Sequence, residues 1–421
     1  MNEGKEILKD SETQEEEKRN ILQRLFVRRG CLQAVLLPFL AVLTAFVIGA
    51  VIIAVSSPEV LTTLRTEGLL NGLGAALNLV LESYVALFEG SFGSPARILR
   101  AMGSGEKRAL LDAFRPLSES LVITTPYIFA GLGLALGFRG GLFNIGAEGQ
   151  LFVGGLASVY VGYSITGLPW YLHLPLAMLA GILGGALWGA IPGFLKARTG
   201  AHEVINTIMM NYIAFRLTDH LLSGPMARPD GLPITPEIAT SAYLPALFSR
   251  PMRVHVGFFL ALGAAALVYW FLWKTTLGLE IRMVGANPHA SRYAGIRIAP
   301  TIVITMALSA ALAGLAGTSQ ILGVDHRMVR AFSTGYGFDA IALALLGNSH
   351  PVGVVLASLL FGFLRGGAAR MQSIAGVPVE IIRIIQALVL IFVAAPEIIR
   401  GIYRLKVARE EERVLMRGWG S

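Results

Sequence analysis

Carboxylates and side-chain amides stand out in this chain because they interrupt some of its most apolar segments. The first group lies in GFRGGLFNIGAEGQ, residues 137–150, and comprises Asn144, Glu148 and Gln150. In a lipid-embedded helix such groups are costly unless they face a polar cavity or a hydrogen-bonding partner. We therefore expect them to line a polar pathway. The alternative is that Asn144 caps the following helix at the membrane interface and that Glu148 is half solvated.

A second group lies in AHEVINTIMMN, residues 201–211. Glu203, Asn206, Thr207 and Asn211 follow one another near i, i+3, i+4 and i+8, so most of them share one face of a helix. A polar stripe on a membrane helix indicates a face that points into the bundle. The stripe either lines the same pathway or hydrogen-bonds a neighbouring helix, which is worth about 0.6 kcal/mol for each bond.

The third group centres on Asp339 in TGYGFDAIALALLGNSH, residues 334–350. The apolar run 337–346 is about half as long as a full membrane crossing, which predicts a broken or half helix. A carboxylate there either accepts hydrogen bonds from the free backbone N–H groups of the helix N-terminus or belongs to the pathway. Its place in the first turn favours the N-terminal role.

A fourth segment, LGLEIRMVGANPHASRYAGIRI at residues 277–298, is a polar loop that predicts contact with another protein. Asn287 is a natural helix cap, and Pro288 fits the first turn of a short helix. Loops of this length without a function are uncommon in compact bundles. The alternative is a solvated connector. The residues expected at the contact are Gly285, Asn287, Pro288, Arg292, Tyr293 and Gly295.

Enzyme chemistry finds no support in the sequence. The chain has no paired catalytic acids and no HExxH, GxSxG or GxxxxGK[ST] motif. Its single cysteine, Cys31, excludes an intrachain disulfide and a multi-cysteine metal site. We predict no catalytic residue, metal site or cofactor in this chain.

The composition requires a membrane to hold these residues. Of 421 residues, 54% are hydrophobic and 15% are charged, and the mean hydropathy is +0.63. A single soluble core and a disordered chain are both excluded. The net charge of +8 is better explained by membrane topology than by nucleic acid binding. The sequence predicts an all-α integral membrane protein.

Apolar runs predict about ten membrane helices. They lie at residues 32–55, 117–138, 142–165, 172–195, 204–222, 254–273, 301–322, 337–346, 352–364 and 379–393. Residues 69–88 are interrupted by polar side chains, and we interpret them as an interfacial helix rather than a span. Small residues every fourth position predict close helix packing, at Gly181, Gly185, Gly189 and Gly193 and at Ser358, Gly362 and Gly366.

The distribution of positive charge predicts the topology. Residues 1–30 form a cytoplasmic segment, 31–398 the transmembrane domain and 399–421 a basic cytoplasmic tail. Within the membrane domain, residues 56–116 are an extracytoplasmic insertion and 275–298 a cytoplasmic loop. The turns at Arg139 and 196–198 are also cytoplasmic, whereas 223–253 lies outside. Treating 69–88 as a span would reverse these assignments, which is why we leave it out.

Four motifs, in order, resemble those of bacterial ATP-binding-cassette (ABC) importer permeases for simple sugars and nucleosides. They are GLFNIGAEGQ, EVINTIMMNYIA, GANPHASRYAGI and GYGFDAIALALLG, beginning at residues 141, 203, 285 and 335. The resemblance is closest to permeases that work with a basic-membrane-protein-type receptor for purine nucleosides, and weaker to ribose and branched-chain amino-acid permeases. It covers residues 117–396, leaving 1–30, 91–114 and the tail unmatched.

The resemblance implies a multi-pass protein of the bacterial inner membrane with both termini in the cytoplasm. It implies two inverted repeats, residues 117–222 and 301–393, that work by alternating access. The implied partners are ATPase subunits that bind ATP and Mg²⁺, a second permease copy or a paralogue, and an extracytoplasmic substrate-binding lipoprotein. Residues 285–296 would be the coupling helix. The alternative is an ion-coupled secondary transporter, against which the docking loop argues, and the choice between nucleoside and sugar stays open.

Overall fold

Apolar runs form helices through almost all of residues 36–404, the part of the chain described by this computed structural model. Within that part there are two isolated β-bridges and no strand. Seven described helices are long and apolar enough to cross a membrane: Leu36–Ser56, Leu69–Phe92, Lys107–Arg139, Trp170–Thr199, Gly257–Lys274, Ile298–Asp325 and Pro351–Ala375. The pair α15 (Glu380–Ala394) and α16 (Pro396–Ile402), bent by 91°, makes up to eight. The all-helical prediction is confirmed, whereas the count of about ten is not.

The described residues divide into two compact units. Ile53–Arg383 forms the larger one, and residues 36–52 and 384–404 belong to the smaller one. In the smaller unit the hydroxyl groups of Thr44 and Tyr403 lie 3.0 Å apart. The polar segments identified from the sequence all belong to the larger unit. Cys31 and most of the two terminal segments lie outside the described residues.

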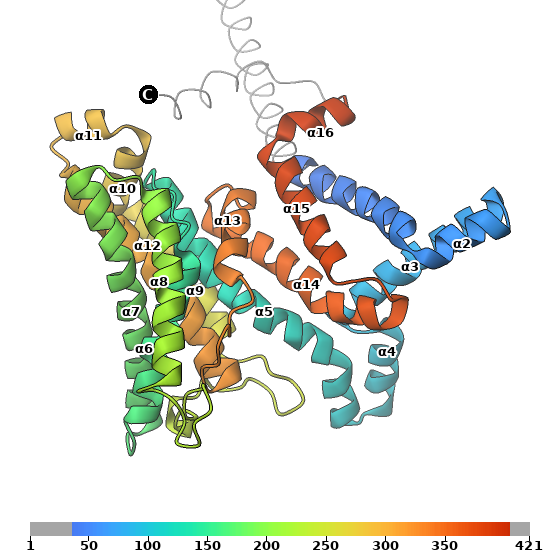
Figure 1. Cartoon of the computed structure of the whole chain (residues 1–421), viewed down its shortest axis with the longest axis horizontal. Coiled ribbons are helices and arrows are strands. Elements are labelled where there is room, and N and C mark those ends of the chain that lie inside the picture. Colours follow the sequence, from blue (N-terminus) through green and yellow to red (C-terminus); the bar gives the residue numbers. More distant parts are fainter. Residues whose placement is uncertain (1–35, 405–421) are drawn as a thin grey trace, which may run out of the picture. The chain divides into compact units, whose positions relative to one another are not determined.

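Helix α5 (Lys107–Arg139) is the centre of the larger unit, and its residues 124–137 are buried. It packs against α12 (Ile298–Gln320), α13 (Tyr336–Leu346), α14 (Pro351–Ala375) and α9 (Gly257–Lys274). Figure 1 shows α5 running between the α6–α9 group and α14. A helix buried on all sides in this way positions the elements around it.

Glycine stripes allow the closest helix contacts, as the sequence predicts. On α7 (Trp170–Thr199), Gly185 lies against the backbone of Gly314 in α12, where a Cβ atom would come within 2.9 Å of the Gly314 Cα. On α14, a Cβ at Gly362 would lie 3.1 Å from the Ser120 carbonyl of α5. Both stripes therefore face neighbouring helices.

Two further helices carry the polar motifs. Helix α6 (Ala147–Ser164) packs against α7, α12 and α8 (Glu203–Ser223), and α8 in turn packs against α6 and α7. Neither α6 nor α8 is among the seven candidate spans. The sequence predicts a span at each of them, residues 142–165 and 204–222, and both helices carry polar side chains of the motifs.

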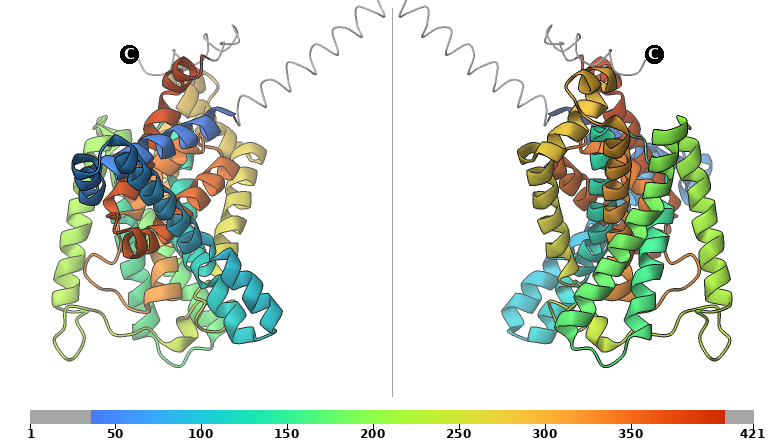
Figure 2. Two further views of the ribbon diagram at one scale, coloured as in Figure 1. Left: turned by 90° about the vertical axis from the view of Figure 1, so that its right-hand side faces the viewer. Right: turned by 90° about the vertical axis from the view of Figure 1, so that its left-hand side faces the viewer.

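The turns assigned to one side of the membrane share one end of the larger unit. Arg139 donates to the carbonyl of Ser349 across 2.9 Å, and a Cβ at Gly141 would lie 2.9 Å from the Gly285 Cα. Helices α10 (Thr276–Ala286) and α11 (Pro288–Tyr293) lie at this end, and residues 224–256 lie at the other (Figures 1 and 2). We name the two the α11 end and the opposite end.

Residues 69–88, interpreted above as interfacial, belong to the continuous 24-residue helix α3 (Leu69–Phe92). It packs against α14 and α5, and a Cβ at Gly90 would lie 2.9 Å from the Gly367 Cα. Its length and composition meet those of a membrane span, which an interfacial segment does not require. The short helices α2 (Pro58–Thr66) and α4 (Pro95–Ser104) flank it in the chain.

Candidate functional site

The first polar motif forms a closed network that we name the amide cluster, made of Asn144, Gln150 and Ser309. The Asn144 amide donates to Gln150 Oε1 across 2.9 Å and to the Ser309 hydroxyl across 3.0 Å. Its oxygen accepts from the Gly146 backbone N–H and from Gln150 Nε2. All three side chains are buried. The cluster therefore joins the start of α6 to α12.

Helix α8 is fastened to α6 by the second motif. Asn211 accepts from the Gly149 N–H across 2.8 Å and donates to the Ile145 carbonyl across 3.0 Å. Glu203 is paired with Lys196 at 2.5 Å, at the α11 end. The polar stripe thus bonds α8 to neighbouring helices, which is the alternative to lining a pathway. Asn206 lies apart from it, and its buried Nδ2 finds no hydrogen-bond partner among residues 36–404.

Glu148 caps a helix other than its own. The side chain is buried, so the half-solvated interpretation is wrong. Its Oε2 accepts from the Gly337 N–H, in the first turn of α13, across 2.6 Å. A carboxylate at a helix N-terminus satisfies free N–H groups and complements the helix dipole. Gly337 permits this approach, because a Cβ there would lie 2.6 Å from the Glu148 Cα.

Asp339 lies in the first turn of α13, as predicted, but it makes no capping bond; the N-cap residue is Gly335. Its Oδ2 instead accepts from the Tyr127 hydroxyl across 2.6 Å and from Arg365 Nη1 across 3.0 Å. Asp339 therefore keeps its predicted place near the positive end of the helix dipole, while Glu148 accepts the N-terminal bond and a guanidinium group from α14 pairs with the Asp339 carboxylate.

We name Asp339, Arg365, Tyr127 and Tyr336 the ion-pair cluster. Arg365 also donates to the Tyr127 hydroxyl across 2.5 Å and to the Thr334 carbonyl across 2.9 Å. Its guanidinium carbon lies 5.3 Å from the Tyr336 ring centre, within cation–π range. The Asp339 and Arg365 side chains are 37% and 22% exposed. This cluster ties α13 to α5 and α14 while leaving charged atoms accessible.

Arg365, Tyr127 and Tyr336 were not predicted as site residues. One signal was available for Arg365, since it follows directly on the apolar run 352–364. A cation at membrane depth marks a pairing or pathway position by default. Nothing in the sequence identifies Tyr127 as its partner, because the two residues are 238 positions apart.

The predicted docking segment forms the exposed helix α11. Asn287 caps it by accepting from the Ala290 N–H across 3.0 Å, and Pro288 begins it, as predicted. Tyr293 is 95% exposed. Gly285 lies against the turn after Arg139, so α11 is connected to the ends of α5 and α10.

At the opposite end, the loop of residues 224–256 pairs with the segment that leads to α13. The Tyr243 and His326 rings stack at 3.7 Å, beside a groove of about 640 Å³ also lined by Trp170 and Arg250. His255 is buried here and accepts from the Gly257 N–H. Burial, with a smaller effect of His326, lowers the pKa of His255 to about 4.

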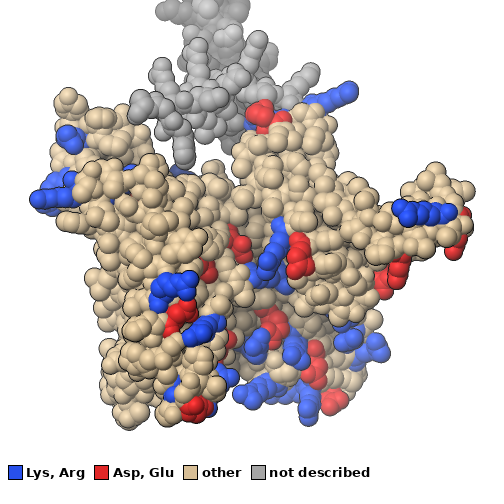
Figure 3. Space-filling model, in the orientation of Figure 1, with Lys and Arg blue, Asp and Glu red and all other residues tan. Residues whose placement is uncertain are grey.

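Charged side chains are concentrated at the opposite end on the face drawn in Figure 3, and much of the rest of that face carries few. No group of three or more metal-ligating His, Cys, Asp or Glu side chains occurs among residues 36–404.

Comparison with known proteins gives a family for this arrangement. Residues 117–394 match the model "Branched-chain amino acid transport system / permease component". The guanosine ABC transporter permease protein NupP of Bacillus subtilis is 46% identical over 68% of this chain and 82% of its own length. The glucose ABC transporter permease protein TsgB13 of Haloferax volcanii is 38% identical over 69% and 79%. The nucleoside ABC transporter permease protein NupB of Lactococcus lactis is 34% identical over 69% and 82%. No solved structure matches the chain.

Proposed function

This chain belongs to the family of permease components of branched-chain amino acid transport systems, and on that premise we propose that it is the permease of an ATP-driven importer of nucleosides. An ABC permease is a transport component rather than an enzyme. The observation that carries the solute assignment is the 46% identity to a guanosine permease. A simple sugar is the second candidate, because another relative is a glucose permease.

The proposed importer needs partners that supply energy and solute. ATP and Mg²⁺ would bind to ATPase subunits, on which α11 docks as a coupling helix. The 95% exposure of Tyr293 and the single turn formed by Pro288–Tyr293 support a protein contact there. A second permease copy or paralogue and an extracytoplasmic substrate-binding lipoprotein complete the complex in the bacterial inner membrane, with both termini of this chain in the cytoplasm.

The proposed mechanism is alternating access between two inverted repeats, residues 117–222 and 301–393. We assign the movement to helix α13. It has only 11 residues, and side chains from α5, α6 and α14 connect it to the helices around it. Coupling to the ATPase would pass from α11 through Gly285 to the ends of α5 and α10.

Within this mechanism the ion-pair cluster is the part of the predicted pathway that contacts solute. Its guanidinium and carboxylate match the hydrogen-bonding edges of a nucleoside, while the buried rings of Tyr127 and Tyr336 hold Arg365 in place. Glu148, Asn144, Gln150, Glu203 and Asn211 act by positioning helices. Asn206, whose Nδ2 has no partner in the described part of the chain, remains a candidate for direct contact.

Reconstitution tests the function directly. The complex of this chain with its ATPase, permease and receptor partners, placed in vesicles, is expected to accumulate radiolabelled guanosine only with Mg-ATP and regardless of ionophores. Accumulation of glucose instead would favour the second candidate. Uptake that continues without the ATPase and collapses with the ion gradient would establish the ion-coupled alternative.

The coupling role of α11 has its own test. Replacing Tyr293 by Ala and Arg292 by Glu is expected to reduce capture of the ATPase subunits by this chain. The matched control is Arg65→Glu in α2, which changes an exposed cation outside the family-matched region. Equal ATPase capture by all of these variants would rule out the assignment.

A further inference from the structure

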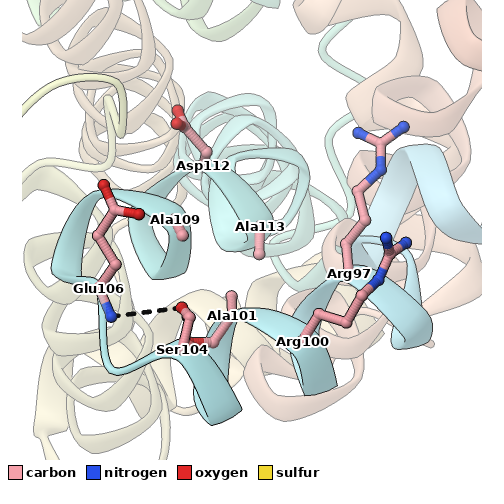
Figure 4. Close-up of a pocket in the computed structure, with 8 residues that line it drawn as sticks. All are labelled: Arg97, Arg100, Ala101, Ser104, Glu106, Ala109, Asp112 and Ala113. Carbon is pink, nitrogen blue, oxygen red and sulfur yellow. Dashed lines mark hydrogen bonds between the residues drawn. The ribbon is translucent and has the colours of Figure 1, made fainter.

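A cavity of about 460 Å³ lies between α4 and the first turns of α5, in a segment to which the proposed transport function assigns no role. Three alanines, Ala101, Ala109 and Ala113, form its small-residue lining (Figure 4). Ala101 and Ala113 are buried, so the two helices pack closely there. The cavity precedes residue 117, where the family match begins.

Opposite charges line opposite sides of the cavity. Arg97 and Arg100 extend from α4 on one side, whereas Glu106 and Asp112 lie on the other (Figure 4). The four residues are exposed, and no ion pair joins any two of them in the part of the chain that the structure describes. The charges are thus held apart across the cavity, which suits a ligand that carries an anion and a cation a few ångströms from each other.

The position of the cavity along α5 places it at the level of the lipid headgroups. With 33 residues, α5 is about 50 Å long, whereas the hydrocarbon core is about 30 Å thick. The apolar run of α5 begins at residue 117. Ala113 and Ala109 precede it by roughly 6 and 12 Å at 1.5 Å per residue, the depth at which lipid headgroups lie.

Helix α4 also carries an apolar face suited to lipid. Leu99 and Met102 are 70% and 64% exposed. At 100° per residue they lie on a different side of the helix from Arg97 and Arg100. A short helix with one basic and one apolar side is typical of the membrane interface.

We propose that this cavity binds the headgroup of a phospholipid that carries a primary ammonium group, such as phosphatidylethanolamine. Arg97 and Arg100 bind the phosphate, as guanidinium groups do through paired N–H donors. Glu106 and Asp112 accept hydrogen bonds from the ammonium.

Native mass spectrometry of the full-length protein in detergent tests the proposal with three lipids of identical acyl chains. Phosphatidylethanolamine is expected to bind roughly tenfold more tightly than phosphatidylglycerol, which lacks the cation, or phosphatidylcholine, whose quaternary ammonium donates no hydrogen bond. Equal binding of all three, or preference for phosphatidylglycerol, would overturn the proposal. This measurement needs no variant and no transport activity.

Paired variants separate the two sides of the cavity. Arg97→Ala with Arg100→Ala is expected to weaken phosphatidylethanolamine binding about tenfold, and Glu106→Gln with Asp112→Asn is expected to abolish its advantage over phosphatidylglycerol. The control, Arg65→Ala with Glu59→Gln, changes an exposed cation and an exposed anion of α2. Unchanged lipid binding in the cavity variants would contradict the site. If they instead lost only receptor-stimulated ATPase activity, the cavity would be a receptor contact and the proposal would be wrong.

Discussion

The amide cluster and the ion-pair cluster contain polar side chains predicted for the same pathway, yet they differ in how their hydrogen bonds are used. In the amide cluster, Asn144 is bonded through both its donor and its acceptor atoms, and every member is buried. In the ion-pair cluster, Asp339 and Arg365 keep 37% and 22% of their side-chain surface exposed. The two clusters therefore differ in the exposure of their polar side chains, and the proposed function assigns solute contact to the ion-pair cluster alone.

The proposed difference between the two clusters would be refuted most clearly if replacing Arg365 left uptake unchanged. Arg365→Met leaves the Asp339 carboxylate and the Thr334 carbonyl without their cation. Breaking a fully buried ion pair costs about 3–5 kcal/mol, and the cost is lower here because this pair is partly exposed. We expect guanosine uptake per assembled complex to fall roughly 100-fold.

Arg370→Met is the matched control, since Arg370 lies on the same helix and is paired with Glu89 at 2.6 Å. Its uptake is expected to stay within about threefold of that of the unmodified protein, a difference of less than 1 kcal/mol. If both variants lost uptake equally, the ion-pair cluster would have no special role.

Glu148 sharpens the difference between positioning and contact. Glu148→Ala removes the acceptor for the Gly337 N–H and leaves the α13 terminus unsatisfied. An unsatisfied buried donor costs about 1–3 kcal/mol, so uptake should fall roughly 10-fold or more. Glu148→Gln keeps an acceptor for the Gly337 N–H and should therefore restore most of the lost uptake. Measured uptake that was equally low in both variants would show that the charge, and not the helix cap, is required.

The amide cluster should respond in stability and not in transport. Asn144→Ala leaves Gln150 and Ser309 with lost bonds, so the free energy of unfolding should drop by about 1–3 kcal/mol. Uptake per folded complex should change by about twofold or less, which corresponds to under 0.5 kcal/mol. Thermal unfolding in detergent and uptake, measured on the same preparation, check the two halves of this expectation. A large uptake loss without a change in unfolding temperature would place Asn144 on the path.

At the opposite end, pH is expected to affect stability and not uptake. The pKa of His255 is lowered to about 4 in the folded protein, whereas an unfolded histidine has a pKa of about 6.5. The unfolded state therefore binds a proton first, and stability is lost as the pH falls from about 6.5 to 4, by up to about 3 kcal/mol.

His255→Asn removes the titrating group and offers an oxygen to the Gly257 N–H. The fall in unfolding temperature between pH 7 and pH 5 should be smaller in this variant than in the unmodified protein. An unchanged pH dependence would show that other groups cause it.

Local signals predicted much of the helical fold. The run 337–346 corresponds to α13 at Tyr336–Leu346, and Asn287 with Pro288 marked the start of α11. These features depend on apolar length and capping, which neighbouring residues determine. The helix predicted at residues 352–364 ended too early, because α14 continues through Arg365 and Arg370 to Ala375. Both arginines are paired with acids from other helices, which no local pattern reveals.

The site was harder to predict because partners are chosen by tertiary contacts. The sequence identified Glu148 and Asp339 as unusual but not their partners: Glu148 caps α13, and Asp339, within α13, binds Arg365. The partner of Glu148 lies 189 positions away. Composition and spacing indicate which polar groups need partners, and only the packed helices determine which partners they find.

Cysteine accessibility tests most directly whether the ion-pair cluster lies on the solute path. With Cys31, the single native cysteine, replaced by Ser, Thr334→Cys places a thiol on an exposed residue whose carbonyl accepts from Arg365, and Ser309→Cys places one in the amide cluster. A polar thiol reagent should label the first position in the assembled transporter, more slowly once receptor and solute are added, and should not label the second. Labelling of both positions, or of Thr334→Cys at a rate that solute does not change, would contradict the account.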